Sequence, residues 1–234
     1  MSLIKNFFNE LYYTKYSKKS YSISNVDLII DHLLINTKKG IYIDVGCNHP
    51  IKYNNTYLLY KKGWRGINID ADKTSIKLFN KFRKKDHNLN CIVSDKEEIK
   101  EFYYYHARSA INTISKDLVD SRISKPKRII KEKSTTLNKI IENSPFAESK
   151  INLLSIDIEN HEYEALKNFN FLKYKVDVIV IECIDINQKK LEMYNQSLDF
   201  IMNEKIYKLL INNNYKLINW VHSDLVFIQN KHAL

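Results

Sequence analysis

Acidic and small polar residues follow the apolar runs of this chain, where the strands of an α/β sheet would end. They are Asp44 to Asn48, Asp70 with Asp72, Ser94 with Asp95, Asp157 to Glu162, and Glu182. In an open parallel sheet the carboxyl ends of the strands form one edge, and ligands bind there where the strand order reverses. We therefore expect a single ligand-binding site among these residues, although acids at such positions can also serve only as helix caps.

A single glycine remains of the glycine-rich loop that binds dinucleotides. Gly46 follows an apolar run, but Asn48 and His49 occupy positions after it, so the backbone cannot easily approach a pyrophosphate. One glycine still lets an adenosyl group approach, and Asp44 can face an ammonium or sulfonium group. Asp70, at the end of the next apolar run, stands where a carboxylate would bind ribose hydroxyls. S-adenosylmethionine suits these residues better than NAD, which remains the alternative.

Methyl transfer to a hydroxyl requires a base that removes the hydroxyl proton. His161 is the first candidate, because an unperturbed imidazole titrates near pH 6.5, and Glu159 or Glu162 could orient it. His49 is the rival base, and His161 could equally do no more than begin a helix. Asp157, Glu159 and His161 could instead bind Mg²⁺ or Mn²⁺ that acidifies the hydroxyl, an arrangement that we do not favour.

Strands and helices alternate along the chain, which predicts a parallel sheet covered by helices. The expected strands are residues 40–46, 66–72, 90–95, 98–106, 151–160 and 176–182, with a closing hairpin at 215–230, and the expected helices are 25–36, 54–63, 135–143, 161–169 and 198–214. Residues 107–133 are polar and basic and contain Pro126, so we expect a mobile insertion near the mouth of the site.

The composition sets broad limits on location and partners. No apolar run approaches the roughly 18 residues of a membrane span, and no signal peptide is evident, so we expect a cytoplasmic protein. The three cysteines form no CxxC pair, which argues against a disulfide framework or a zinc cluster. The net charge of +10 could attract an anionic acceptor or nucleic acid, although basic runs are usually solvated faces.

Four stretches, in chain order, resemble the FkbM-type S-adenosylmethionine-dependent methyltransferases. They are IDVGCNHP, NNTYLLYKKGWRGINIDAD, CIVSD and LLSIDIENHEYEALKNF. The resemblance implies a Rossmann-like seven-stranded class I methyltransferase sheet, mostly parallel with a C-terminal antiparallel strand and with helices on both faces. Residues 40–234 would form this domain, and residues 1–39 an N-terminal helical cap or extension.

The resemblance also implies roles for individual residues. The cofactor-binding set would be Asp44, Gly46 and Asn48 at the methionine end, Asp70 at the ribose, Ser94 and Asp95 at the adenine edge, and Asp157. Apart from the resemblance, we expect the acceptor to meet Asn55, Thr56, Tyr57 and Glu162, of which the first three could equally begin a helix. The chain departs from the family pattern at Asn160, where a glycine is common, and at Asp70, where Glu is common. Because Asn tolerates positive φ, a turn at Asn160 remains feasible.

We therefore expect an S-adenosylmethionine-dependent O-methyltransferase. Its acceptor would be a small molecule or glycan precursor (a sugar, nucleotide-sugar or phosphorylated metabolite, possibly anionic) in bacterial surface-polysaccharide or natural-product biosynthesis. One alternative is an RNA or DNA methyltransferase, whose electrostatic footprint would be the net positive charge. Another is a catalytically inactive S-adenosylmethionine-binding protein, suggested by the missing glycine at Asn160.

Overall fold

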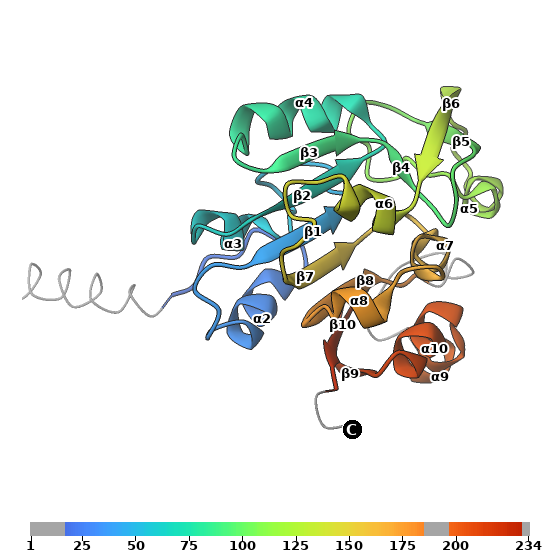
Figure 1. Cartoon of the computed structure of the whole chain (residues 1–234). Helices are drawn as coiled ribbons and strands as arrows, with labels where there is room; N and C mark the ends of the chain where they lie inside the picture. The colour runs from blue at the N-terminus through green and yellow to red at the C-terminus, as the bar shows by residue number, and fades with distance from the viewer. Residues whose placement is uncertain (1–16, 185–196, 231–234) are drawn as a thin grey trace, which may run out of the picture.

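The computed structural model describes residues 17–184 and 197–230, which contain a seven-stranded sheet in the order β3-β2-β1-β7-β8-β10-β9 (Figure 1). The strands are β1 (Ile41–Val45), β2 (Arg65–Asp70), β3 (His87–Asn90), β7 (Ile151–Ile156), β8 (Val178–Glu182), β9 (Tyr215–Val221) and β10 (Asp224–Gln229). The first five in the spatial order run parallel, and β10 is antiparallel to both its neighbours. The predicted mostly parallel sheet and closing hairpin are confirmed.

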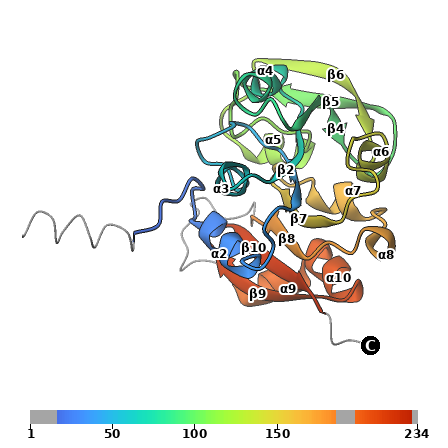
Figure 2. The same ribbon diagram turned by 60° about the vertical axis from the view of Figure 1, so that its left-hand side comes forward.

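Alternating side chains on the strands build two apolar layers, as the two-residue period of a strand requires. In β1, Ile43 and Val45 enter the larger layer, whereas Tyr42 enters the smaller one. The larger layer is covered by α6 (Leu137–Glu142), α7 (Glu162–Leu166), α8 (Phe171–Tyr174), α9 (Leu198–Asn203) and α10 (Lys205–Asn212). The smaller layer is covered by α2 (Val26–Leu33) and α3 (Tyr57–Lys61). Figure 2 shows α2 and α3 on one side of the sheet and α7, α8 and α10 on the other.

The segment before the first strand packs into this fold. Val26 and Ile30 of α2 are fully buried in the smaller apolar layer, which also contains Val178 and Val226. Asn25 precedes the helix with φ 62°, and its side chain makes no capping hydrogen bond. The α2 helix is thus part of the hydrophobic core of the described chain.

A second sheet, in the order β4-β6-β5, lies beyond the carboxyl ends of β1 and β2 (Figure 1). It consists of β4 (Ile92–Val93), β5 (Ile99–Tyr104) and β6 (Arg128–Thr135), with α5 (Lys116–Ser121) between β5 and β6. The strand expected at 90–95 is therefore divided. Its start belongs to β3 in the main sheet, and after Cys91 the chain crosses to pair with β6 at Ser134 and Thr135. The segment 107–133, expected as an insertion, contains α5 and most of β6.

The single helix expected at 198–214 is two helices, α9 and α10. Glu204 between them is extended, with φ −64° and ψ 140°. Ile201 and Ile206 lie five positions apart, so one straight helix would point them in different directions. The break allows both side chains to enter the same apolar layer, where they are 1% and 6% exposed.

Candidate active site

A cavity of about 600 Å³ opens at the carboxyl edge of the main sheet, where the strand order reverses between β1 and β7. This volume lies in the roughly 300–1,000 Å³ range of small-molecule sites. The predicted site residues that line it are Asp44, Gly46, Asn48, His49, Asn55, Asp70, Asp157 and Glu159. The predicted residues outside its lining are Thr56, Tyr57, Ser94, Asp95, His161 and Glu162. Eight of the predicted site residues therefore line one cavity, and six lie outside its lining.

Gly46 holds the end of β1 against the end of β7. It has φ +78°, and a Cβ atom there would lie 1.7 Å from the backbone oxygen of Asp157. Asp157 N donates a hydrogen bond to Val45 O at 3.0 Å, which fixes the same contact. The glycine is thus required for the close approach of two strand ends that both line the cavity.

Asp70 ends β2 and faces the cavity from the position predicted for a ribose-binding carboxylate. Its two oxygens accept backbone hydrogen bonds from Asn48 N at 2.8 Å and Asp72 N at 2.7 Å. Asn48 adopts φ 47°, which turns the loop after β1 toward Asp70. Burial raises the pKa of Asp70 to about 7, although these two amides act in the opposite direction. Each carboxylate oxygen retains a further lone pair for a ligand hydroxyl.

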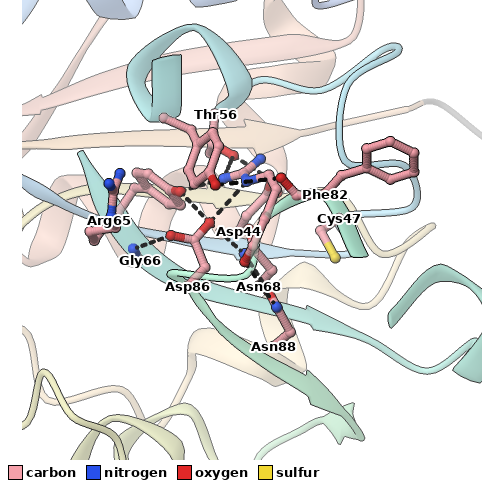
Figure 3. A network of polar contacts seen from close by, with 12 residues as sticks. Asp44, Cys47, Thr56, Arg65, Gly66, Asn68, Phe82, Asp86 and Asn88 are labelled. Atoms are coloured by element: carbon pink, nitrogen blue, oxygen red, sulfur yellow. Dashed lines mark hydrogen bonds and ion pairs between the residues drawn. The ribbon is translucent and has the colours of Figure 1, made fainter. Parts of the chain in front are cut away.

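A buried polar network below the loop holds Asp44 (Figure 3). The Asp44 carboxylate accepts hydrogen bonds from Asn54 Nδ2 at 2.9 Å and Thr56 Oγ1 at 2.8 Å. The Arg83 guanidinium donates to Asn54 Oδ1 and Thr56 Oγ1, both at 3.0 Å, and pairs with Asp86 at 2.9 Å. Both side chains of that ion pair are fully buried. Asn54 and Thr56 thus link Asp44 to the turn after α4 (Lys73–Phe82), and Thr56 belongs to the network instead of facing an acceptor.

Tyr57 also lies away from the cavity. Its ring packs edge-on against Tyr21 with the ring centroids 4.8 Å apart. Asn55, in contrast, lines the cavity and donates a hydrogen bond from Nδ2 to Ser155 Oγ at 3.2 Å. Of the three neighbouring residues predicted to meet the acceptor, the structure brings one to the cavity.

Three carboxylates crowd together at the ends of β7 and β8. Single oxygens of Asp157, Glu159 and Glu182 lie within 4.8 Å of one another. Arg122 donates to Glu159 Oε2 at 2.6 Å, and Ser223 Oγ donates to Glu182 Oε1 at 3.4 Å. Burial is the main cause that raises all three pKa values, that of Glu159 to about 7, and repulsion from Asp157 raises those of Glu159 and Glu182 further.

The comparison with protein-family models bears directly on this site. The model of the methyltransferase FkbM domain matches residues 44–217, which include β2, β7, β8 and the last two residues of β1. The chain belongs to the FkbM methyltransferase family. No curated protein sequence matches it. Within the residues that the structure describes, no helix is long and apolar enough to cross a membrane.

The turn after β7 decides which side chains of this FkbM methyltransferase reach the cavity. Glu159 and Asn160 have φ values of 55° and 70°, so the turn expected at Asn160 does form and includes Glu159 as well. Two consecutive left-handed residues reverse the chain direction, which is a costly conformation outside glycine. Thr113 Oγ1 supports the turn by donating to Glu159 O at 2.9 Å. Glu159 consequently lines the cavity, and the residues after Asn160 turn away from it.

His161 was our first candidate for the base, and its environment does not suit that role. It is 9% exposed, it lies outside the cavity lining, and its Nε2 is 3.1 Å from Ser94 Oγ. Burial, reinforced by Lys100, lowers the pKa of His161 to about 4. Among the described residues, Asp157, Glu159 and Glu182 lie close enough together that they could hold a metal ion, and His161 is not part of this group.

Three further predicted residues make contacts in the protein interior or at its surface instead of lining the cavity: Ser94, Asp95 and Glu162. Ser94 Oγ donates to Asp95 Oδ1 at 3.1 Å, and Asp95 pairs with Lys167 at 2.8 Å. Glu162 is 6% exposed and accepts a hydrogen bond from Ile158 N at 2.9 Å. The nearby wall of the cavity is formed by Cys91, Ile92 and Val93, whose apolar surface suits the face of an adenine better than Ser94 does.

His49, our rival candidate for the base, lines the cavity in a fixed orientation. Its Nδ1 accepts hydrogen bonds from Ile51 N at 3.1 Å and Lys52 N at 3.0 Å. The neutral ring must therefore carry its proton on Nε2. His49 thus offers a hydrogen-bond donor to a ligand, and its pKa is lowered by burial and by Arg108 and Lys52.

Several lining residues were missing from the predicted set. They include Ile23, Cys91 to Val93, Ala107 to Ser109 and His222 to Asp224. Glu182 was expected at this edge of the sheet, but no role had been assigned to it. The sequence did carry a signal for Asp224, which begins an antiparallel strand that must start at the edge where its parallel neighbours end. Ile23 gave no such signal, because it reaches the cavity only through the packing of the N-terminal segment.

Proposed function

We propose that the chain transfers a methyl group from S-adenosylmethionine to a hydroxyl of a small molecule or glycan precursor. The observation that carries the proposal is the cavity at the reversal point of the strand order, which joins Asp70 on β2 to the carboxylate trio on β7 and β8. When bound, S-adenosylmethionine supplies an electrophilic methyl group on a cationic sulfur. The cavity walls are suited to its separate parts.

The donor would lie along the β1 and β2 side of the cavity. Asp70 would accept the ribose hydroxyls through the lone pairs that its two backbone contacts leave open. Cys91 to Val93 would cover the adenine. Asp157 and Glu182 would face the ammonium group, and such a cation would offset the mutual repulsion of these acids.

Glu159 would act as the base in this proposal. It lines the cavity, and its pKa is about 7. A base with this pKa is deprotonated in a large fraction of molecules at neutral pH and still accepts a proton readily. Its carboxylate would take the proton of the acceptor hydroxyl as the oxygen forms its bond to carbon. Arg122, at 2.6 Å from Glu159 Oε2, would fix the direction of the carboxylate.

Calorimetric titration with S-adenosylmethionine, S-adenosylhomocysteine and NAD tests the donor. We expect micromolar binding of the first two and no binding of NAD. Asp70→Asn should weaken S-adenosylhomocysteine binding by about tenfold or more, since hydrogen bonds to charged groups contribute about 1.5–3 kcal/mol. Tight binding of NAD alone would overturn the proposal.

Asp95→Asn is the matched control for Asp70→Asn, because it makes the same chemical change outside the cavity lining. We expect it to leave donor affinity unchanged. The melting temperature of each variant shows whether the fold is retained, which matters for Asp70 because its carboxylate also accepts two backbone amides.

A further inference from the structure

The wall of the cavity also carries basic side chains for which the donor proposal has no use. His49, Lys52 and Arg108 all line it, and they come from the loop after β1 and the loop after β5. Lys52 and Arg108 are exposed at its rim, whereas His49 is partly buried. Two segments that are distant in sequence thus place three basic groups on one cavity.

These cations have no acidic partners in the part of the chain that the structure describes. Neither Lys52 nor Arg108 is a member of any ion pair there. Lys52 Nζ lies 4.4 Å from the centroid of the Tyr53 ring, a contact that leaves its charge uncompensated. Asp72, which also lines the cavity, uses its oxygens to accept from Arg108 N at 2.6 Å and Thr74 N at 2.8 Å.

Charge is separated within the cavity. The neighbours that lower the pKa of His49 are Arg108 and Lys52, and no acid counters them. The neighbours that shift the pKa of Glu159 are Asp157 and Arg122. The basic rim and the carboxylate trio are therefore two electrostatic environments on one cavity. A ligand that spans them would place a negative group at the rim and a positive group at the trio.

Backbone contacts hold the His49 ring and the loop that carries Arg108. Both hydrogen bonds to His49 Nδ1 fix its ring, so Nε2–H remains as a donor. Arg108 adopts φ 54°, and its N–H bond to Asp72 ties the loop after β5 to the end of β2. A fixed N–H donor beside two cations is the arrangement that binds an oxyanion.

We propose that His49, Lys52 and Arg108 form an anion-binding subsite for the acceptor, which therefore carries a phosphate or carboxylate group in addition to the methylated hydroxyl. The inference rests on the proposed function in one respect, that the bound anion is the methyl acceptor. The subsite itself can be tested with or without the donor. The shared chemistry is an oxyanion, and the probes below distinguish its two sources.

Glucose 1-phosphate, glucuronate and glucose are the probes, each titrated by calorimetry into the full chain alone and into the chain saturated with S-adenosylhomocysteine. We expect at least one anionic sugar to bind about tenfold or more tightly than glucose, which corresponds to about one charge-assisted contact. Preference for glucose 1-phosphate assigns a phosphate, and preference for glucuronate assigns a carboxylate. Equal binding of all three sugars, or no binding of either anion, would overturn the proposal.

The double variant Lys52→Gln/Arg108→Gln should reduce the affinity for the anionic sugar by about tenfold or more. Its matched control is Lys84→Gln/Lys85→Gln, which removes the same charge from exposed positions outside the cavity lining. We expect the control to bind like the unaltered chain. An equal loss in both doubles would show a general effect of net charge and would refute the subsite.

The same titrations separate this inference from the proposed function. If the first double loses S-adenosylhomocysteine affinity while it retains the anionic sugar, the cations bind the donor carboxylate and the subsite is refuted. If the unaltered chain fails to bind S-adenosylhomocysteine but binds the anionic sugar through Lys52 and Arg108, the subsite stands and the proposed donor is wrong.

Discussion

The acids in the two halves of the sheet edge differ in the hydrogen-bond donors around them. In the β1 and β2 half, the acids accept hydrogen bonds from the protein. Asn54 and Thr56 donate to Asp44, and two backbone amides donate to Asp70. In the β7 and β8 half, three carboxylates crowd within 4.8 Å. In the described part of the chain, Arg122 donates to Glu159 and Ser223 donates to Glu182.

The difference separates acids that hold the site in shape from acids that are available for chemistry. A carboxylate with internal donors is oriented, and its replacement disturbs the backbone that it binds. Burial raises the pKa of acids in both halves, that of Asp70 and that of Glu159 to about 7, so the pKa does not separate them. The crowded carboxylates differ in lying close together, an arrangement that attracts a cation. The predictions below test this division, beginning with the residue that joins the two halves.

Gly46→Ala should have the largest effect. The added Cβ would lie 1.7 Å from Asp157 O, a backbone atom that cannot move without separating β1 from β7. We expect the free energy of unfolding to fall by at least about 3 kcal/mol, or the protein not to fold. Urea denaturation followed by circular dichroism measures the change.

Gly63→Ala is the control, since Gly63 also has positive φ, at +95°, but a Cβ atom there meets nothing within 4 Å. We expect a loss of about 1 kcal/mol from backbone strain alone. Equal losses in the two variants would mean that the contact between the halves contributes little.

Glu159→Gln should produce the largest loss of activity in a protein that still folds. Gln can still accept the hydrogen bond from Arg122, but it cannot take a proton, and general-base catalysis contributes about 10²- to 10⁴-fold. We expect turnover to fall by that factor while S-adenosylhomocysteine affinity changes little. In the unaltered chain, turnover should rise with pH up to about 7, where Glu159 loses its proton.

His161→Gln tests the residue that sequence reasoning placed first. We expect the free energy of unfolding to fall by about 1–2 kcal/mol, because the buried contact with Ser94 is lost, and turnover of the folded variant to change by less than about threefold. A loss of turnover as large as that of Glu159→Gln would show that His161 reaches the reaction.

Glu162→Gln tests whether the neighbouring acids of the β7 and β8 half, together with burial, keep Glu162 protonated in the folded protein. Burial, with smaller contributions from Asp157 and Glu159, raises the pKa of Glu162 to about 8, well above the value near 4.3 of an unfolded chain. The native state therefore holds this proton where the unfolded state releases it. The contribution of Glu162 to the free energy of unfolding is largest below about pH 4. It decreases as the pH rises toward about 8, by at most about 1.4 kcal/mol per pH unit.

The advantage of Glu162→Gln over the unaltered chain should accordingly grow from about pH 5 to about pH 8 in urea denaturation. Gln retains an oxygen for the hydrogen bond from Ile158 N. Glu148→Gln, the same substitution at an exposed position, should show no such trend. A constant difference across this pH range would show that Glu162 is ionised in the folded protein.

Removal of divalent metal should have the smallest effect. Arg122 already places a cation at 2.6 Å from Glu159 Oε2, so the trio has a counter-charge within the protein. We expect turnover after treatment with a chelator to stay within about twofold of the untreated value. Loss of turnover that Mg²⁺ or Mn²⁺ restores would instead make Asp157, Glu159 and Glu182 metal ligands.

Much of the main sheet could be predicted because its signals are local. The continuous apolar runs of β7 and β8 demand burial on both faces, and β1 shows the two-residue alternation between the apolar layers. The second sheet was not predicted. Its strand β4 is two residues long and pairs with residues about forty positions later, a contact without a local pattern.

The sequence by itself determined that acids would gather at one edge of a parallel sheet, because strand ends in such a sheet share an edge whatever the loops do. Only the tertiary structure decided which of them face the cavity. The consecutive left-handed residues Glu159 and Asn160 direct one side chain inward and turn His161 toward Ser94. Arg122 and the loop at Arg108 come from a segment distant in sequence, and they set the charge on the two sides of the cavity. Side-chain direction after a strand depends on such turns and distant contacts, which residue type and spacing do not encode.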